Sequence, residues 1–169
     1  MQNAGLFAAC LPLQFLGFAF AAHAETIRIV ALGASNTVGR GGASYPAELE
    51  SMLRAKGYNV QVINAGANGD TTAGMLARLD SSVPAGTRLV LLNPANLNDN
   101  KAGIRGQQAS YVAQIKSRLA ARGIKTIVLP SFISIGAKHT DSEHFGAEGY
   151  RSMATHVLPQ VMAAIGPAH

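Results

Sequence analysis

Three residues of this sequence have the types and positions of a nucleophile, a base and an orienting acid. Ser35 follows the apolar run of residues 26–33. A serine between a strand and a helix lies near backbone N–H groups that can stabilise an oxyanion. Asp141 and His144 stand three residues apart, so the carboxylate can fix the histidine tautomer while the other ring nitrogen takes a serine proton. These residues predict acyl transfer through a serine.

Each of these signals is common when it stands alone. Serine is a routine loop and helix-cap residue, and Asp-x-x-His also occurs in surface turns before helices. Position 37 is Thr, so the Gly-x-Ser-x-Gly elbow of the α/β-hydrolases is absent. A phosphate- or flavin-binding loop at residues 33–37 is therefore an alternative. That alternative gives Asp141 and His144 no role, and the loops lack aromatics to stack on a flavin.

The elements that must position these residues alternate between short β-branched runs and longer helical stretches. The predicted strands are residues 26–33, 59–66, 87–93 and 124–131, and the predicted helices are 45–57, 71–83, 107–123 and 147–166. Near-continuous apolar strands that alternate with helices predict a parallel sheet covered on both faces. In such sheets ligands bind beyond the carboxyl ends of the strands. We predict one α/β domain over residues 25–169.

Four short blocks resemble, in order, the motifs of the SGNH (GDSL-type) hydrolases. They are GASN at 33–36, NAGANGDTT at 64–72, NLND at 96–99 and DSEH at 141–144. The match covers nearly all of the chain after residue 24, and VINAGANGDTTAGMLARL is especially similar to the family's periplasmic thioesterase/lysophospholipase-like esterases. The resemblance implies a three-layer α/β/α fold with a parallel, flavodoxin-like sheet of about four to five strands.

The resemblance also implies catalytic roles. Ser35 would be the nucleophile, His144 the general base and Asp141 the residue that orients it. Such an enzyme hydrolyses small or single-chain acyl (carboxylic) esters through an acyl-enzyme on Ser35, and it needs no metal and no cofactor. The expected partner is a small-molecule ester. From the residues themselves, no His/Asp/Glu cluster has metal-ligand spacing.

The oxyanion hole implied by the resemblance has three donors. They are the backbone N–H of Ser35, the backbone N–H of Gly69 and the side-chain amide of Asn98, with Asn96 as a rival for the third. Gly69 also has a reason of its own, because a backbone N–H offered to a ligand needs close approach that a side chain would obstruct.

One departure from the family pattern concerns the oxyanion loop. The family has Asp just before the nucleophile, where this chain has Ala34. A polar support for the loop is therefore missing unless Asn36 or Asp70 supplies it. If nothing does, the protein would be a catalytically weakened, SGNH-like binder of acyl or sugar ligands.

The N-terminal segment predicts export. Residues 1–24 contain no Lys, Arg, Asp or Glu and run through an apolar block to Ala22-His23-Ala24. Small residues two apart after such a block are what a signal peptidase cuts. We predict a signal peptide at 1–24, a periplasmic or secreted protein, and no stable membrane insertion after cleavage. A buried first helix and a lipid on Cys10, the only cysteine, are the alternatives.

The charge pattern argues against nucleic acid as a partner. The net charge is +5, and Lys and Arg are scattered from Arg28 to Arg151 rather than clustered. The few aromatic residues do not interleave with them. A nucleic-acid-binding stripe needs both features.

Overall fold

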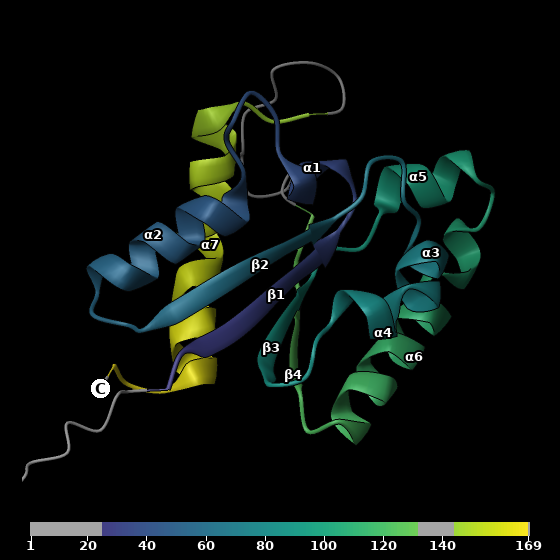
Figure 1. Ribbon diagram of the computed structural model, residues 1–169. Helices are drawn as coiled ribbons and strands as arrows, with labels where there is room; N and C mark the ends of the chain where they lie inside the picture. Colours follow the sequence, from purple (N-terminus) through teal and green to yellow (C-terminus); the bar gives the residue numbers. More distant parts are fainter. Residues whose placement is uncertain (1–24, 132–143, 169) are drawn as a thin grey trace, which may run out of the picture.

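The computed structural model describes residues 25–131 and 144–168, and at its centre lies a parallel sheet (Figure 1). The strands are β1 (Ile27–Gly33), β2 (Val60–Gly66), β3 (Thr87–Leu92) and β4 (Lys125–Val128). They are hydrogen-bonded in the order β2-β1-β3-β4, and every neighbouring pair is parallel. The predicted parallel sheet is confirmed, with four strands.

The last strand is shorter than the sequence predicts. Residues 124–131 read as one strand, but β4 ends at Val128. The backbone N–H of Leu129 still donates to the Leu92 carbonyl at 2.8 Å. Pro130 then follows and has no N–H to continue the ladder.

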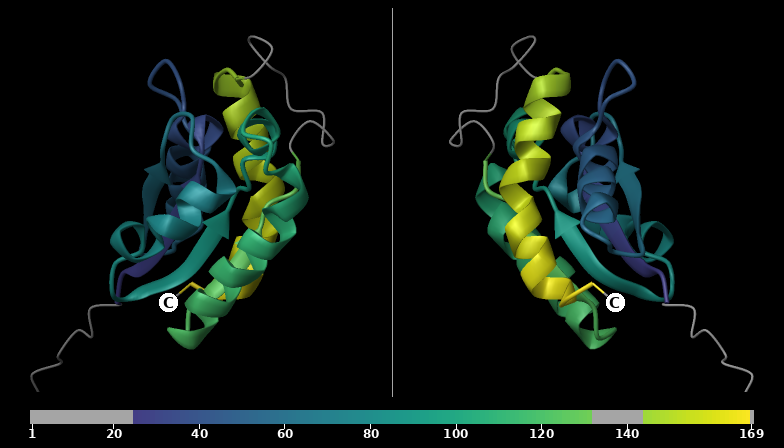
Figure 2. Two further views of the ribbon diagram at one scale, coloured as in Figure 1. Left: turned by 90° about the vertical axis from the view of Figure 1, so that its right-hand side faces the viewer. Right: turned by 90° about the vertical axis from the view of Figure 1, so that its left-hand side faces the viewer.

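Helices cover both faces of the sheet (Figure 2). On one face lie α2 (Tyr45–Ala55) and α7 (Ala147–Ile165); on the other lie α3 (Thr72–Ala77), α4 (Leu79–Ser82) and α6 (Gln108–Ala121). Alternate residues of β1 and β3 divide between the two cores, as the two-residue strand period requires. Ile29, Ala31, Leu89 and Leu91 face α2 and α7, whereas Val30, Leu32, Val90 and Leu92 face the other helices. The predicted three-layer α/β/α architecture is confirmed.

Three further segments differ from their predicted structure. The chain forms helices α1 (Ser35–Val38) and α5 (Asn96–Lys101) where loops were expected, with a short 3-10 turn, η1 (Arg105–Gln107), after α5. The helix predicted at 71–83 is broken between α3 and α4 at Arg78, whose φ of −96° and ψ of 11° leave the helical range. Asn and Asp are weak helix formers, so contacts with other segments rather than intrinsic propensity hold α5.

The register of the sheet aligns the carboxyl ends of its central strands. Gly33 at the end of β1 pairs with Gly66 at the end of β2, and Leu32 pairs with Leu92 of β3. The loops that follow these three strands therefore leave the sheet at one edge.

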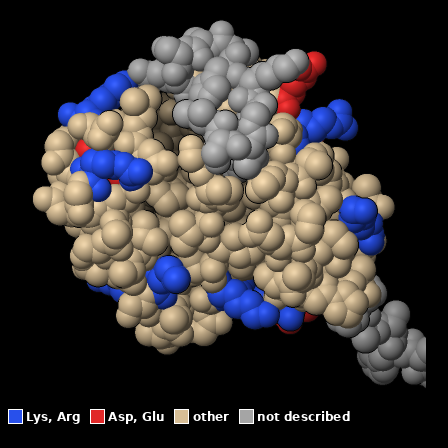
Figure 3. Space-filling view, turned by 180° about the vertical axis from the view of Figure 1, so that it is seen from behind, with Lys and Arg blue, Asp and Glu red and all other residues tan. Residues whose placement is uncertain are grey.

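Outside the sheet edge, the surface shows separated charges. Figure 3 shows Lys and Arg side chains spaced singly over one face of the molecule, without a continuous stripe. Among the described residues, no helix is both long enough and apolar enough to cross a membrane. The predicted signal peptide, residues 1–24 with Cys10, lies outside the described residues.

Candidate active site

The nucleophile candidate is the first residue of a short helix packed on the ends of two strands. Ser35 begins α1 directly after β1. A Cβ at Gly33 would collide with the side chain of Thr37, and one at Gly66 would collide with the backbone of Val38. Both strand ends therefore need glycine so that α1 can lie against them. This close contact determines the position of Ser35.

Two asparagines at the ends of β2 and β3 also hold α1. The Asn64 amide donates to the Val38 carbonyl at 3.1 Å, and the Asn93 amide donates to the Thr37 hydroxyl at 3.3 Å. Thr37 is fully buried. The helix that carries Ser35 is thus attached to both neighbouring strands.

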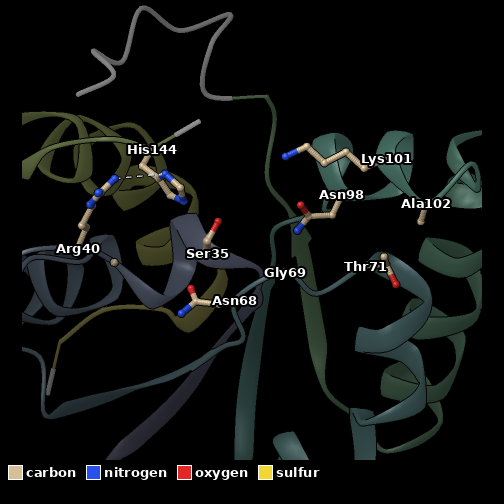
Figure 4. A pocket seen from close by; sticks show the side chains of 10 residues that line it. Ser35, Arg40, Asn68, Gly69, Thr71, Asn98, Lys101, Ala102 and His144 are labelled. Carbon is tan, nitrogen blue, oxygen red and sulfur yellow. Dashed lines mark hydrogen bonds between the residues drawn. The ribbon is translucent and has the colours of Figure 1, made fainter. Parts of the chain in front are cut away.

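The base candidate is held beside α1 by the residue that follows it. Phe145 is buried and stacks edge-on against Tyr150, with ring centroids 6.2 Å apart. Its backbone N–H donates to the Asn36 side chain at 3.4 Å. Since Asn36 adjoins Ser35, this contact places His144 next to the nucleophile's helix, and Figure 4 shows the Ser35 hydroxyl directed toward the His144 ring.

The third triad candidate, Asp141, lies outside the described residues. One described neighbour of the His144 ring is Arg40, whose Nη1 lies 3.5 Å from Nδ1 (Figure 4). Arginine has donors only, so it cannot accept the Nδ1 proton that a general base needs to hold. Another group must accept that proton if His144 acts as a base.

The loop after β2 carries the second oxyanion candidate. Gly69 has a φ of +72°, which L residues other than glycine rarely adopt. Nothing lies within 4 Å of a Cβ built there, so space is open at this point. The backbone conformation therefore requires glycine at position 69, in addition to the close approach expected from the sequence.

The two rival asparagines of α5 have different positions. The Asn98 side chain lines the pocket beside Ser35 and donates to the Asp70 carbonyl at 2.7 Å. The Asn96 side chain accepts from Arg105 at 2.9 Å at the surface and does not line that pocket. The structure thus brings Asn98, and not Asn96, to the pocket of Ser35, Gly69 and His144.

A buried carboxylate beside Asn98 holds α5 in place, and the sequence reasoning did not single it out. Asp99 is fully buried. It accepts from the Thr72 backbone N–H at 2.8 Å, the Thr72 hydroxyl at 2.6 Å and the Gln108 amide at 2.6 Å. A buried carboxylate is tolerated only with such partners. It ties α5 to the start of α3 and so positions Asn98.

One pocket of about 710 Å³ lies between Ser35, Gly69, Asn98 and His144 (Figure 4). The described residues that line it are Ser35, Gly39, Arg40, Asn68, Gly69, Thr71, Asn98, Lys101, Ala102 and His144. None of these is a large aliphatic or aromatic residue. Within residues 25–131 and 144–168, no group of His, Cys, Asp and Glu side chains is arranged to hold a metal ion.

Comparison with known proteins places this geometry in a fold family. No family model matches the chain. The curated protein Esterase TesA from Pseudomonas aeruginosa is 29% identical over 130 residues, which are 76% of this chain and 64% of TesA. The crystal structure of AlinE4, an SGNH-hydrolase family esterase, matches with a TM-score of 0.61 and 26% identity over 85% of this chain and 98% of AlinE4. The chain has the SGNH-hydrolase fold.

A second solved structure supports the same SGNH-hydrolase architecture. The crystal structure of TesA matches with a TM-score of 0.70 and 21% identity, covering 81% of this chain and 99% of that one. The resemblance inferred from the four sequence blocks is thereby confirmed at the level of fold. The chain spans about 64% of the length of its curated relative. Esterase neighbours do not favour the flavin-binding alternative.

Proposed function

We propose that this chain is a serine esterase that hydrolyses small or single-chain acyl esters through an acyl-enzyme on Ser35. One observation carries the proposal: a single pocket gathers Ser35, Gly69, Asn98 and His144. These residues come from four separate segments of the chain, after β1, after β2, on α5 and before α7. Their types match the nucleophile, the oxyanion donors and the base of acyl transfer.

The proposed reaction begins when the Ser35 hydroxyl attacks the ester carbonyl carbon and His144 takes its proton. The oxyanion of the tetrahedral intermediate accepts hydrogen bonds from the backbone N–H groups of Ser35 and Gly69 and from the Asn98 amide. Collapse of the intermediate breaks the ester bond, and His144 gives the proton to the departing alkoxide. Water, deprotonated by His144, then attacks the acyl-Ser35 ester; the intermediate collapses to release the acid, and His144 returns the proton to the departing Ser35 oxygen.

Asp141 completes this proposal as the group that orients His144. Nε2 can accept the serine proton only when Nδ1 carries the ring hydrogen. A carboxylate accepts that hydrogen and stabilises the imidazolium formed during attack. Arg40, at 3.5 Å from Nδ1, has no acceptor to offer, so we assign the role to the carboxylate three residues before His144, as the family resemblance implies.

The lining of the pocket favours short acyl groups. Its described side chains are mostly polar or charged, and none is a large aliphatic residue that would cover a long hydrocarbon chain. Each buried methylene of an acyl chain gains about 0.8 kcal/mol only where apolar surface receives it. We therefore propose that acetyl and butyryl esters react faster than octanoyl or longer ones.

The cellular location is proposed from the sequence. The apolar segment that ends at Ala24 supports a signal peptide, and export would give a periplasmic or secreted enzyme. Mass spectrometry of the exported protein should show a chain that begins at Glu25 and has no thiol. An intact Met1 terminus, or a lipid on Cys10, would contradict this maturation.

Hydrolysis of p-nitrophenyl esters of increasing chain length tests the catalytic proposal. The wild type should release p-nitrophenol, and Ser35→Ala should abolish the release while its thermal unfolding stays unchanged. Mass spectrometry after treatment with an organophosphate should locate the adduct on Ser35. Binding of esters without turnover by a folded wild type would instead show the weakened binder considered for Ala34.

A further inference from the structure

Arg78, between α3 and α4, makes three hydrogen bonds with its guanidinium. Nε donates to Asp70 Oδ2 at 2.8 Å, Nη2 donates to the Gly33 carbonyl at 3.1 Å, and Nη1 donates to the Ser82 hydroxyl at 2.9 Å. The side chains of Arg78 and Asp70 are only 26% and 12% exposed. A planar fork with several donors suits such a site better than a single ammonium does.

Two of these bonds end beside the proposed oxyanion donors. Gly33 is two residues before Ser35 on the same strand end, and Asp70 directly follows Gly69. The Asp70 carbonyl also accepts the Asn98 amide at 2.7 Å. One guanidinium therefore connects the segments that carry all three donors.

The local structure around Asp70 is built to receive this contact. The second carboxylate oxygen, Oδ1, accepts the Thr71 backbone N–H at 2.9 Å at the start of α3. A Cβ at Gly74 would collide with that same oxygen, so glycine leaves room for the carboxylate. Asp70 is thus held on both oxygens, one by the helix start and one by Arg78.

The bond from Arg78 to the Gly33 carbonyl lies next to Ala34, the position where the family has an acidic residue. Ala34 is partly buried against the apolar core beneath α3 and α6 and offers no polar side chain to the loop after β2. Arg78 bonds the carbonyl of the preceding residue, Gly33, and through Asp70 connects it to that loop.

We propose that Arg78 is a positioning residue that holds the three oxyanion donors at a common spacing. This inference rests on the proposed esterase function. Arg78 does not line the pocket, so it acts through Gly33 and Asp70 rather than by contact with substrate.

Replacement of Arg78 by methionine tests this role. Arg78→Met should lower kcat by about ten- to a hundredfold, the cost of donors displaced by a fraction of an ångström. KM should stay within about threefold, because the donors act on the transition state more than on bound substrate. Arg78→Lys should recover part of the loss, since an ammonium can pair with Asp70 but cannot span both partners.

Arg122 is a matched control at the opposite end of the same helical layer. Its side chain also contacts a carbonyl and a carboxylate, with Nη2 donating to Val83 at 2.5 Å and Nη1 at 3.7 Å from Asp80. It is 31% exposed, close to the value for Arg78. Arg122→Met should lower the melting temperature less than Arg78→Met, because Asp80 is 76% exposed and Asp70 only 12%, and it should leave kcat unchanged.

The outcomes separate the inference from the proposed function. Wild-type kcat in Arg78→Met, or an equal loss of kcat in both methionine variants, overturns the positioning role while hydrolysis by the wild type upholds the esterase. If Arg78→Met does not fold, Arg78→Lys decides: kcat equal to wild type overturns the role, and a reduced kcat at unchanged KM supports it. A wild type that hydrolyses no ester overturns both proposals.

Discussion

The two ends of the sheet are built in different ways. At the amino ends of β2, β3 and β4 the chain turns at Gly57, Gly86 and Gly123, each with a positive φ. At the carboxyl ends, side chains bond segments distant in sequence, as Asp99 does with Thr72 and Asn98 with Asp70. The amino end thus combines glycine turns with single long-range bonds such as Arg28 to the Ala85 carbonyl, whereas the carboxyl end carries a network of polar contacts between loops.

Because of this difference, substitutions at the two ends of the sheet should affect stability and activity differently. A substitution at a glycine turn acts mainly by straining the backbone of that turn. A network of polar contacts transmits a change at one residue to several loops. Substitutions at the carboxyl end should therefore alter the proposed catalysis, and matched substitutions at the amino end should alter only the free energy of unfolding.

The largest contrast is expected within the carboxyl end itself. Asn98→Ala should lower kcat by about two to three orders of magnitude, the usual cost of one oxyanion donor. Asn96→Ala should leave kcat nearly unchanged, because the Asn96 side chain bonds Arg105 at the surface. Steady-state kinetics on a p-nitrophenyl ester measures both. The reverse ranking would identify Asn96, and not Asn98, as the third oxyanion donor.

A smaller effect is expected at two glycines of similar conformation. Gly69 and Gly86 have φ values of +72° and +77°, so alanine at either should lower the free energy of unfolding by about 1–2 kcal/mol. Only Gly69→Ala should also lower kcat, by about tenfold, since strain there displaces an oxyanion donor. Urea unfolding and kinetics on both variants check this. Equal kcat in the two would show that strain at Gly69 does not displace its backbone N–H from the oxyanion hole.

The smallest effect is expected at an arginine of the amino end. Arg28 Nη1 donates to the Ala85 carbonyl at 2.6 Å from an exposed position. Because water competes for both groups, Arg28→Met should lower the free energy of unfolding by only about 0.5 kcal/mol. Its kcat should equal that of the wild type. A clear loss of activity in this variant would show that the two ends of the sheet are coupled.

The same contrast explains what could be predicted from the sequence. Strand periodicity and the glycines after the helices were enough to predict the parallel sheet and its two helical faces, because those signals are local. The helix at Asn96–Lys101 was predicted as a loop, since its residues are weak helix formers. Contacts of Asp99 with Thr72 and Gln108 hold it, and the sequence does not show which segments meet.

For the candidate site too, local sequence blocks could be recognised, but contacts between distant segments could not. Ser35, Gly69 and Asn98 were named from blocks that resemble a known family, and the structure brings all three to one pocket with His144. Asp141 stays a prediction. Arg78 lies within the quoted stretch of residues 62–79 but was not singled out, because the sequence does not show that its side chain reaches Gly33, 45 residues away.

The bond from the Thr72 amide to the buried Asp99 carboxylate can report relative motion of α3 and α5. This N–H lies where α3 begins and bonds a residue of α5 at 2.8 Å. Its hydrogen can exchange with solvent only when those two helices separate. The rate of hydrogen exchange at this single amide should therefore measure how often α5, the helix that carries Asn98, moves away from α3.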